Sequence, residues 1–175
     1  PQKTEAEEYG AALERHGVAA LYHYTPKENI PLILAARALL SRREQRLRNV
    51  ASTKIHYWGD SFVHLEDFIC LCFAPPLGVL KREKGNMAVL EVSPEVVTWK
   101  ETCFCPMNSA SPRISAEEIQ SRRDLASFEA LFARPDSSRL RNRAAEILVQ
   151  GDIPLRSIRK IIYPVKNDLR ELPWQ

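Results

Sequence analysis

The chain has 175 residues, the length of one ordinary domain, and we expect a single domain over residues 1–175. Its 45% hydrophobic and 27% charged content are those of a globular protein, and its net charge of +3 permits a nucleic-acid or phosphate partner without requiring one. The longest apolar runs, residues 30–34 and 68–73, are too short to span a membrane. We therefore expect a cytoplasmic protein with no membrane partner.

The first elements predicted are a helix and a strand. Residues 3–16 are rich in Glu and Ala and stop at Gly17, which suits the end of a helix, so residues 1–18 form an expected N-terminal helical segment. "AALYHYT", residues 19–25, has the alternation of a strand. Because positions two apart share a strand face, His23 and Thr25 should point the same way.

A second helix should follow directly. Pro26 suits the first helical position with Thr25 as its N-cap, and an apolar stripe continues over residues 30–38. "LLS", residues 39–41, predicts a short strand. Residues 42–66 are polar and lack periodicity, which is typical of a functional or mobile segment.

The remaining elements are mostly short strands. One helix is expected over residues 115–133, with Leu125, Phe128, Leu131 and Phe132 as its apolar stripe, and a turn with a short helix is expected in "PPLGVLKREKGN". About six or seven strands with helices between them indicate an α+β fold. The strands not yet mentioned are predicted at residues 67–74, 87–93, 96–99, 102–105, 144–151 and 159–164.

The four cysteines form two Cys-x-Cys pairs, Cys70/Cys72 and Cys103/Cys105. If their two strands were neighbours, four thiols could converge on a zinc ion. The usual zinc knuckle, however, is a turn with Cys-x-x-Cys spacing, and both pairs lie in apolar strand patterns. We favour reduced, buried structural thiols over zinc or a disulfide, and expect no metal.

Glu146 in "RNRAAEILVQGDIP" is the first candidate for a reacting group. The apolar residues 147–149 mark a buried strand, where a carboxylate is costly unless it faces a polar cleft. It could be a strand-edge glutamate paired with Arg141 or Arg143. Alternatively, it could stabilise developing positive charge or activate a nucleophile.

Three stretches resemble, in order and spacing, the DarT family of DNA ADP-ribosyltransferase toxins, which is related to the diphtheria-toxin and poly-ADP-ribose polymerase clan. They are "LYHYT…N…IL…LLS" near the start, "DFICLCFAPP" in the middle and "AEILVQGDIPLRSI" near the end, and together they cover roughly residues 20–165. The resemblance implies an ADP-ribosyltransferase-like split central β-sheet with peripheral helices around an NAD cleft. NAD would be consumed as a co-substrate.

The resemblance also implies roles for single residues. Glu146 would stabilise the ribose as NAD is cleaved, or take a proton from the attacking nucleophile. His23 and Thr25 would point into the NAD cleft, and Asn29 would contact the cofactor from the side. The alternatives are a core histidine and a surface helix residue. The other cofactor-binding residues expected are Tyr24, Leu40 and Tyr57.

Residues 42–66 would be the loop that closes over NAD. One arginine, Arg46 or Arg48, would meet the pyrophosphate or serve the reaction, since guanidinium groups suit phosphate oxygens. Tyr57 and Trp58 would stack on the nicotinamide or on a target base, unless they fill the core beneath the loop.

Residues 106–143 would recognise the substrate. This stretch is rich in arginine, which suits a phosphate backbone, although arginine-rich helices are often only solvated surfaces. The expected substrate-binding residues are Asn108, Ser109, Arg113, Arg141 and Arg143.

The function implied is NAD-dependent transfer of ADP-ribose to a base in nucleic acid, with single-stranded DNA as the expected acceptor and nicotinamide as the leaving group. The alternatives are a related enzyme that modifies RNA or protein, or a non-catalytic nucleic-acid-binding module. An RNA phosphate-removing relative would use a histidine and several arginines without needing Glu146. The expected partner besides DNA is an antitoxin with ADP-ribosyl hydrolase activity. We expect a monomer, or a domain delivered into a target cell if it belongs to a larger toxin.

Overall fold

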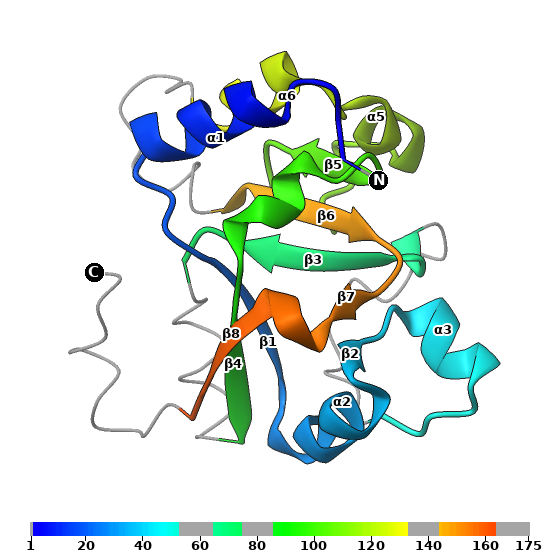
Figure 1. The fold of residues 1–175 in the computed structure, drawn as a ribbon. Helices are drawn as coiled ribbons and strands as arrows, with labels where there is room; N and C mark the ends of the chain where they lie inside the picture. The colour runs from blue at the N-terminus through cyan, green and yellow to red at the C-terminus, as the bar shows by residue number, and fades with distance from the viewer. Residues whose placement is uncertain (1, 53–64, 75–85, 133–143, 164–175) are drawn as a thin grey trace.

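The computed structural model describes residues 2–52, 65–74, 86–132 and 144–163. Its centre is a six-stranded antiparallel sheet in the order β5-β6-β3-β1-β4-β8, accompanied by a two-stranded sheet of β2 and β7 (Figure 1). In the large sheet the strands are β1 Leu21–Pro26, β3 Phe68–Cys72, β4 Met87–Val92, β5 Thr102–Cys105, β6 Glu146–Gln150 and β8 Ile158–Ile162; in the small sheet they are β2 Ala38–Leu39 and β7 Ile153–Pro154.

Short helices surround the sheet. The α-helices are α1 Ala6–Arg15, α2 Ile30–Ala36, α3 Arg42–Leu47, α5 Ala116–Ser121 and α6 Leu125–Glu129, and the 3₁₀ helices are η1 Lys27–Asn29, η3 Pro94–Thr98 and η5 Leu155–Ser157. None of these helices has the length and apolar character needed to cross a membrane. The architecture confirms the predicted α+β fold.

The large sheet is split between β1 and β3. These strands share one register position, Tyr22 opposite Cys72, whereas β1 pairs with β4 along its whole length. In Figure 1, β1, β4 and β8 consequently run across the direction of β3, β5 and β6. The predicted split sheet is therefore present, and its two halves meet at the Tyr22–Cys72 pair.

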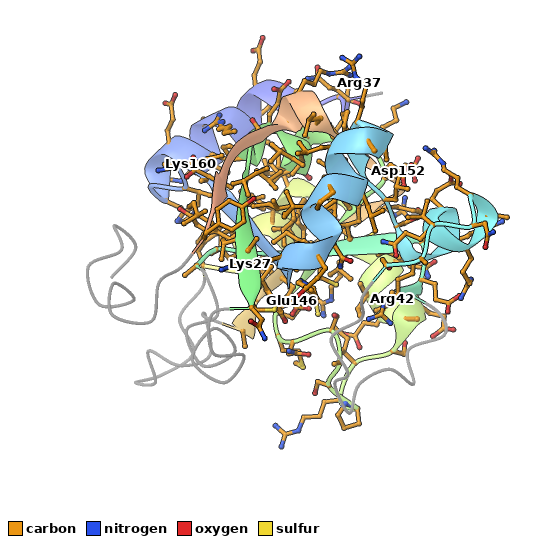
Figure 2. All side chains as sticks on the ribbon, turned by 90° about the horizontal axis from the view of Figure 1, so that it is seen from below. Lys27, Arg37, Arg42, Glu146, Asp152 and Lys160 are labelled. Atoms are coloured by element: carbon orange, nitrogen blue, oxygen red, sulfur yellow. The ribbon has the colours of Figure 1, made fainter. Side chains whose placement is uncertain are left out.

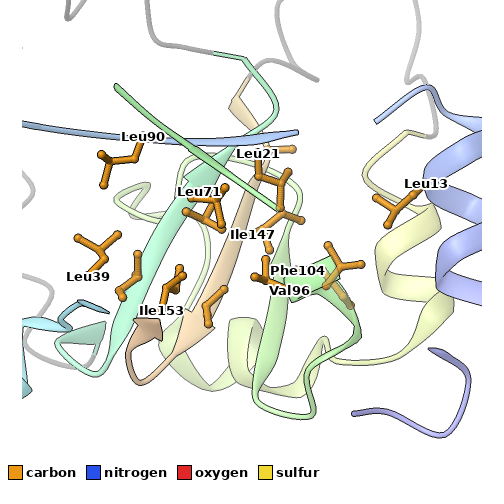
Figure 3. Close-up of a cluster of buried hydrophobic side chains, with 14 of the residues drawn as sticks. Leu13, Leu21, Leu39, Leu71, Leu90, Val96, Phe104, Ile147 and Ile153 are labelled. Atoms are coloured by element: carbon orange, nitrogen blue, oxygen red, sulfur yellow. The ribbon is translucent and has the colours of Figure 1, made fainter. Parts of the chain in front are cut away.

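The main core lies between the sheet and the helices α1 and α6. Leu21, Leu71 and Ile147, from three consecutive strands of the sheet, are fully buried there (Figure 3). Tyr9 of α1 and Phe128 of α6 cover them, with their ring centroids 5.6 Å apart. A second, smaller cluster covers the opposite face of β5 and β6. Strand β6 is thus buried on both faces, as the apolar run after Glu146 predicted.

Several elements differ from the prediction for local reasons. Residues 96–99 do not form a strand, because Pro94 begins the 3₁₀ helix η3. The helix predicted over 115–133 is two helices, since Asp124 accepts a hydrogen bond from the Ser127 N–H and starts α6 anew. Residues 42–47, predicted to be irregular, form α3, which the Ser41 hydroxyl caps.

The chain after β1 also differs. Pro26 is the last residue of the strand, opposite Met87, rather than the first residue of a helix. The 3₁₀ turn η1 follows, and α2 begins only at Ile30, with Pro31 in its first turn. The proline in the first turn of the helix is thus Pro31, and not Pro26 as predicted. Strand β7 was not predicted.

The four cysteines are free, and strand order keeps the two pairs apart. Strand β6 lies between β3 and β5, so Cys72 and Cys105 flank Glu146 from opposite sides. Strands two places apart in a sheet are about 10 Å apart, too far for a disulfide. Among the described residues, no group of three or more His, Cys, Asp or Glu side chains is arranged to hold a metal ion.

We predict that alkaline pH destabilises the protein through these thiols. Burial raises the pKa of Cys105 to about 11 and of Cys72 to about 12, and it also raises the pKa of Cys70 and Cys103. The unfolded chain releases its thiol protons near pH 8.5 while the folded chain keeps them, so stability falls as pH rises above that value. Burial lowers the pKa of Lys3 to about 8. Lys3 therefore adds stability as pH rises, but this is one group, whereas four cysteines act in the other direction.

The measurement is the urea midpoint in reducing buffer between roughly pH 8 and about pH 10. The midpoint should fall over this range, and Cys105→Ala should make the fall shallower, because alanine cannot titrate. A midpoint that stays constant or rises would contradict the prediction.

Candidate active site

Glu146 is the first residue of β6 and lies where the strand leaves the core (Figure 2). Its carboxylate is half-buried, and its Oε2 atom accepts a hydrogen bond of 2.8 Å from the Ser109 N–H. Burial raises the pKa of Glu146, while hydrogen bonds from the Ser109 side chain and backbone oppose the rise. The predicted reacting carboxylate therefore has one dedicated partner, and that partner comes from the segment between β5 and α5.

His23 lies in β1, one residue beyond the point where β1 and β3 part. Its Nδ1 atom is 3.0 Å from the carbonyl oxygen of Cys70 in β3. A carbonyl can only accept, so Nδ1 carries the proton, and burial lowers the pKa of His23, which favours the neutral ring. The Nε2 atom is then left with a lone pair that can accept a hydrogen bond from a substrate hydroxyl.

Thr25 and Asn29 are the other two polar residues of this junction. Both are buried, and the Asn29 Nδ2 group donates a hydrogen bond of 2.9 Å to the Thr25 hydroxyl. Asn29 immediately precedes α2, so this bond ties the end of β1 to the start of the helix. Their role as cofactor contacts stays a prediction.

Cys70 joins these two parts of the site. Its carbonyl takes the His23 hydrogen bond, and its Sγ atom is 3.7 Å from the Ser109 Oγ atom, within reach of a weak hydrogen bond. Ser109 in turn holds Glu146. His23, Cys70, Ser109 and Glu146 thus form one continuous contact network across the split of the sheet. The sequence analysis interpreted Cys70 as a structural thiol and did not place it beside Glu146, because a strand pattern does not show which distant segment lies opposite.

The predicted catalytic arginines lie on and just after α3 and pair with acids of the chain. Arg46 forms an ion pair with Glu66. Arg48 pairs with Glu44 at 2.9 Å and with Asp152 at 3.1 Å (Figure 2 labels Asp152). All these contacts are at least partly exposed, so they fasten α3 loosely to the strand ends, and the catalytic role of the two arginines stays a prediction.

One arginine of α3 not singled out from the sequence is Arg42. The pKa of the Cys70 thiol is raised by burial first and by the charge of Glu146 second, while the Arg42 charge acts in the opposite direction. Because the Arg42 charge lowers the pKa of Cys70, the Arg42 guanidinium is a further cation near the site.

The remaining predicted residues are scattered around the network. Leu40 is buried, and Tyr24 is half-buried against Met87 and Val89. The Asn108 side chain accepts a hydrogen bond of 2.7 Å from the Ala110 N–H. Arg113 is exposed. Four predicted residues, Tyr57, Trp58, Arg141 and Arg143, lie outside the described residues.

The split antiparallel sheet, with Glu146 on one half and His23 on the other, is the arrangement expected for an ADP-ribosyltransferase-like fold. Residues 22–172 match the family model described as "ssDNA thymidine ADP-ribosyltransferase, DarT". The chain belongs to the DarT family. This confirms the family predicted from the sequence. No curated protein sequence matches the chain.

Solved structures with similar folds include proteins of Thermosipho africanus and Thermus sp. 2.9. Thermosipho africanus DarTG in complex with ADP-ribose has a TM-score of 0.59 and 20% identity, covering 87% of this chain and 46% of that chain. Thermus sp. 2.9 DarT in complex with NAD+ has a TM-score of 0.51 and 19% identity, and the match covers 82% of this chain and 81% of that chain. The same Thermus protein in complex with ADP-ribosylated ssDNA has a TM-score of 0.50 and 18% identity, and the match covers 86% of this chain and 84% of that chain. This chain thus spans less than half of the Thermosipho chain.

Proposed function

We propose that this protein transfers ADP-ribose from NAD+ to thymidine in single-stranded DNA and releases nicotinamide. Family membership over residues 22–172 supports the reaction class, and the Thermus relative in complex with NAD+ and with ADP-ribosylated ssDNA supports both substrates. The structural observation that carries the proposal is the Glu146 carboxylate, held by Ser109 at 2.8 Å in one contact network with His23.

Glu146 is the residue suited to the chemical step. In the transfer, the bond from the ribose C1 atom to nicotinamide breaks with its electron pair on nicotinamide, and C1 bonds to a ring nitrogen of thymine. In thymidine N1 already carries the sugar, so N3 is the nitrogen with a proton to lose. A carboxylate stabilises the positive charge on the ribose and takes that proton. A raised pKa makes Glu146 a stronger base than a fully solvated carboxylate.

The neighbouring residues suit the polar parts of NAD. His23 in its neutral form presents Nε2 as an acceptor for a ribose hydroxyl, beside the buried Thr25–Asn29 pair. Arg46 and Arg48 can meet a pyrophosphate by exchanging their present acids for it. Exposed ion pairs are weak, so such an exchange costs little.

We predict that Glu146→Gln abolishes transfer while NAD binding and folding persist. Glutamine keeps the size and an acceptor oxygen but neither the charge nor the basicity, so the loss falls on the transition state. We expect the rate to fall on the order of a hundredfold or more. The measurement is mass gain of a thymidine oligonucleotide, with equilibrium NAD titration and thermal unfolding of the same variant.

His23→Ala is the contrasting variant. If His23 contacts NAD, this change should weaken NAD binding more than it lowers the melting temperature, whereas a purely structural histidine would show the reverse. Near-wild-type turnover of Glu146→Gln would refute the assignment of the carboxylate.

A second prediction concerns the DNA strand. Arg113 is exposed in the segment between β5 and α5, the segment that supplies Ser109. A cation that meets a phosphate releases counterions, so Arg113→Gln should raise the KM for the oligonucleotide and reduce the salt slope of binding by about 0.7. Single strands should react faster than duplex, because a paired base must first leave the stack at a cost of a few kcal/mol.

The matched control is Arg37→Gln. Arg37 is also exposed, and Figure 2 shows it well away from Glu146. It should leave the salt slope unchanged. Equal rates on single strand and duplex, or a salt-independent KM, would point to an acceptor other than a DNA strand.

An antitoxin is the proposed protein partner. The Thermosipho relative is a DarTG protein in complex with ADP-ribose, which supports a partner that acts on the product. An ADP-ribosyl hydrolase would add water across the new C1–N bond and return ADP-ribose and unmodified thymidine. We predict that such a hydrolase restores the mass of an oligonucleotide modified by this protein. A product that resists the hydrolase would argue against this partner.

A further inference from the structure

Ser109 points into the protein, toward the reacting carboxylate. It is only 7% exposed, although it belongs to the segment predicted to meet the substrate. Its backbone N–H donates to Glu146 Oε2 at 2.8 Å, and its hydroxyl lies 3.7 Å from the Cys70 thiol. Ser109 is therefore buried against Cys70 of β3 and Glu146 of β6, and it is not on the exposed surface where a DNA strand would bind.

The Ser109 hydroxyl can link Cys70 to Glu146. Burial, followed by the negative charge of Glu146, raises the pKa of the Cys70 thiol, so Cys70 keeps its proton and is able to donate it to the Ser109 oxygen. With Cys70 as the donor, the Ser109 proton is available to the carboxylate. The Ser109 side chain and backbone both lower the pKa of Glu146, against the effect of burial. One residue thus supplies two donors to one carboxylate.

We infer that Ser109 is a positioning residue, which clamps the Glu146 carboxylate in the orientation used for transfer, and that Cys70 supports the Ser109 hydroxyl. This inference deepens the proposed function, because it takes Glu146 as the catalytic carboxylate. The clamp also ties the substrate segment to the chemistry.

The other groups close to Glu146 are neutral or more distant, so the Ser109 hydrogen bonds are the main interaction that opposes the effect of burial on the pKa of Glu146. Cys72 on β3 and Cys105 on β5 flank Glu146 in register, and burial raises the pKa of both thiols, so they are neutral near pH 7. The Arg42 charge acts on Cys70, one step further away. Removing the Ser109 hydroxyl therefore has one expected electrostatic result, a higher pKa for Glu146.

The first experiment titrates Glu146 directly and needs no turnover. Carbon-13 resonances of the glutamate carboxyl groups are followed against pH, and the Glu146 signal is assigned by its loss in Glu146→Gln. Ser109→Ala should raise the pKa of Glu146 by about half to one unit, a partial effect because the backbone N–H remains. Ser109→Thr, which keeps the hydroxyl, should leave it near the wild-type value.

Matched variants separate the clamp from general disturbance. Ser111→Ala removes a hydroxyl of the same segment that accepts from the Arg113 N–H and is not part of the Glu146 network. It should not move the titration. Cys70→Ala should raise the pKa of Glu146, as Ser109→Ala does. Cys103→Ala removes the same thiol group from β5, on the other side of β6, and should not change that pKa. An unshifted Glu146 in Ser109→Ala, or an equal shift in Ser111→Ala, would overturn the inference.

Kinetics distinguish the clamp from a DNA contact. In Ser109→Ala the acid limb of the kcat–pH profile should move to higher pH by about half to one unit. On that limb the rate should therefore fall about three- to tenfold. The KM for NAD should stay within about twofold of wild type. A raised KM for DNA with an unchanged pH profile would make Ser109 a DNA contact and refute the clamp. If the wild-type protein transfers nothing while the titration still shifts, the proposed function fails and the clamp on Glu146 is supported.

Discussion

The site depends on the single register position that joins β1 to β3. Had the two strands paired along their length, the Cys70 carbonyl would be bonded to the backbone of β1. Because β1 leaves β3 after Tyr22 while it stays paired with β4, that carbonyl needs another donor, and the His23 ring supplies it. The split therefore fixes the tautomer of His23 and leaves the Nε2 lone pair able to accept a hydrogen bond.

The position of Glu146 at the start of β6 explains how a carboxylate can lie on a strand that is buried on both faces. Charge in such a place costs several kcal/mol unless hydrogen bonds compensate. Glu146 is the first residue of β6, where the strand leaves the core, and Ser109 provides its donors. The remaining cost of burial is seen in the raised pKa. The partial burial of Glu146 is thus a compromise. Fuller solvation would return its pKa to the ordinary value and reduce its basicity, whereas deeper burial would favour the protonated, neutral form.

Local patterns predicted the parts of the structure that local physics determines. The apolar run after Glu146 predicted β6 and marked its charge as unusual, and the alternation around His23 predicted β1. Contacts between distant segments could not be predicted in this way. Cys70 meets Ser109 across 39 residues, and Arg48 meets Asp152 across 104. A sequence pattern shows which side chains share a strand face, but not which strand lies opposite.

The ion pairs of Arg43 and Arg48 tie α3 to the two strands that carry Cys70 and Glu146. Arg43 pairs with Asp67 just before β3, and Arg48 pairs with Asp152 just after β6. These are the same two strands whose other ends carry Cys72 and Glu146. Each ion pair is partly exposed and individually weak. The two strands are thus held by weak ion pairs at the end remote from Glu146, and β6 is held by the Ser109 hydrogen bond at the other end.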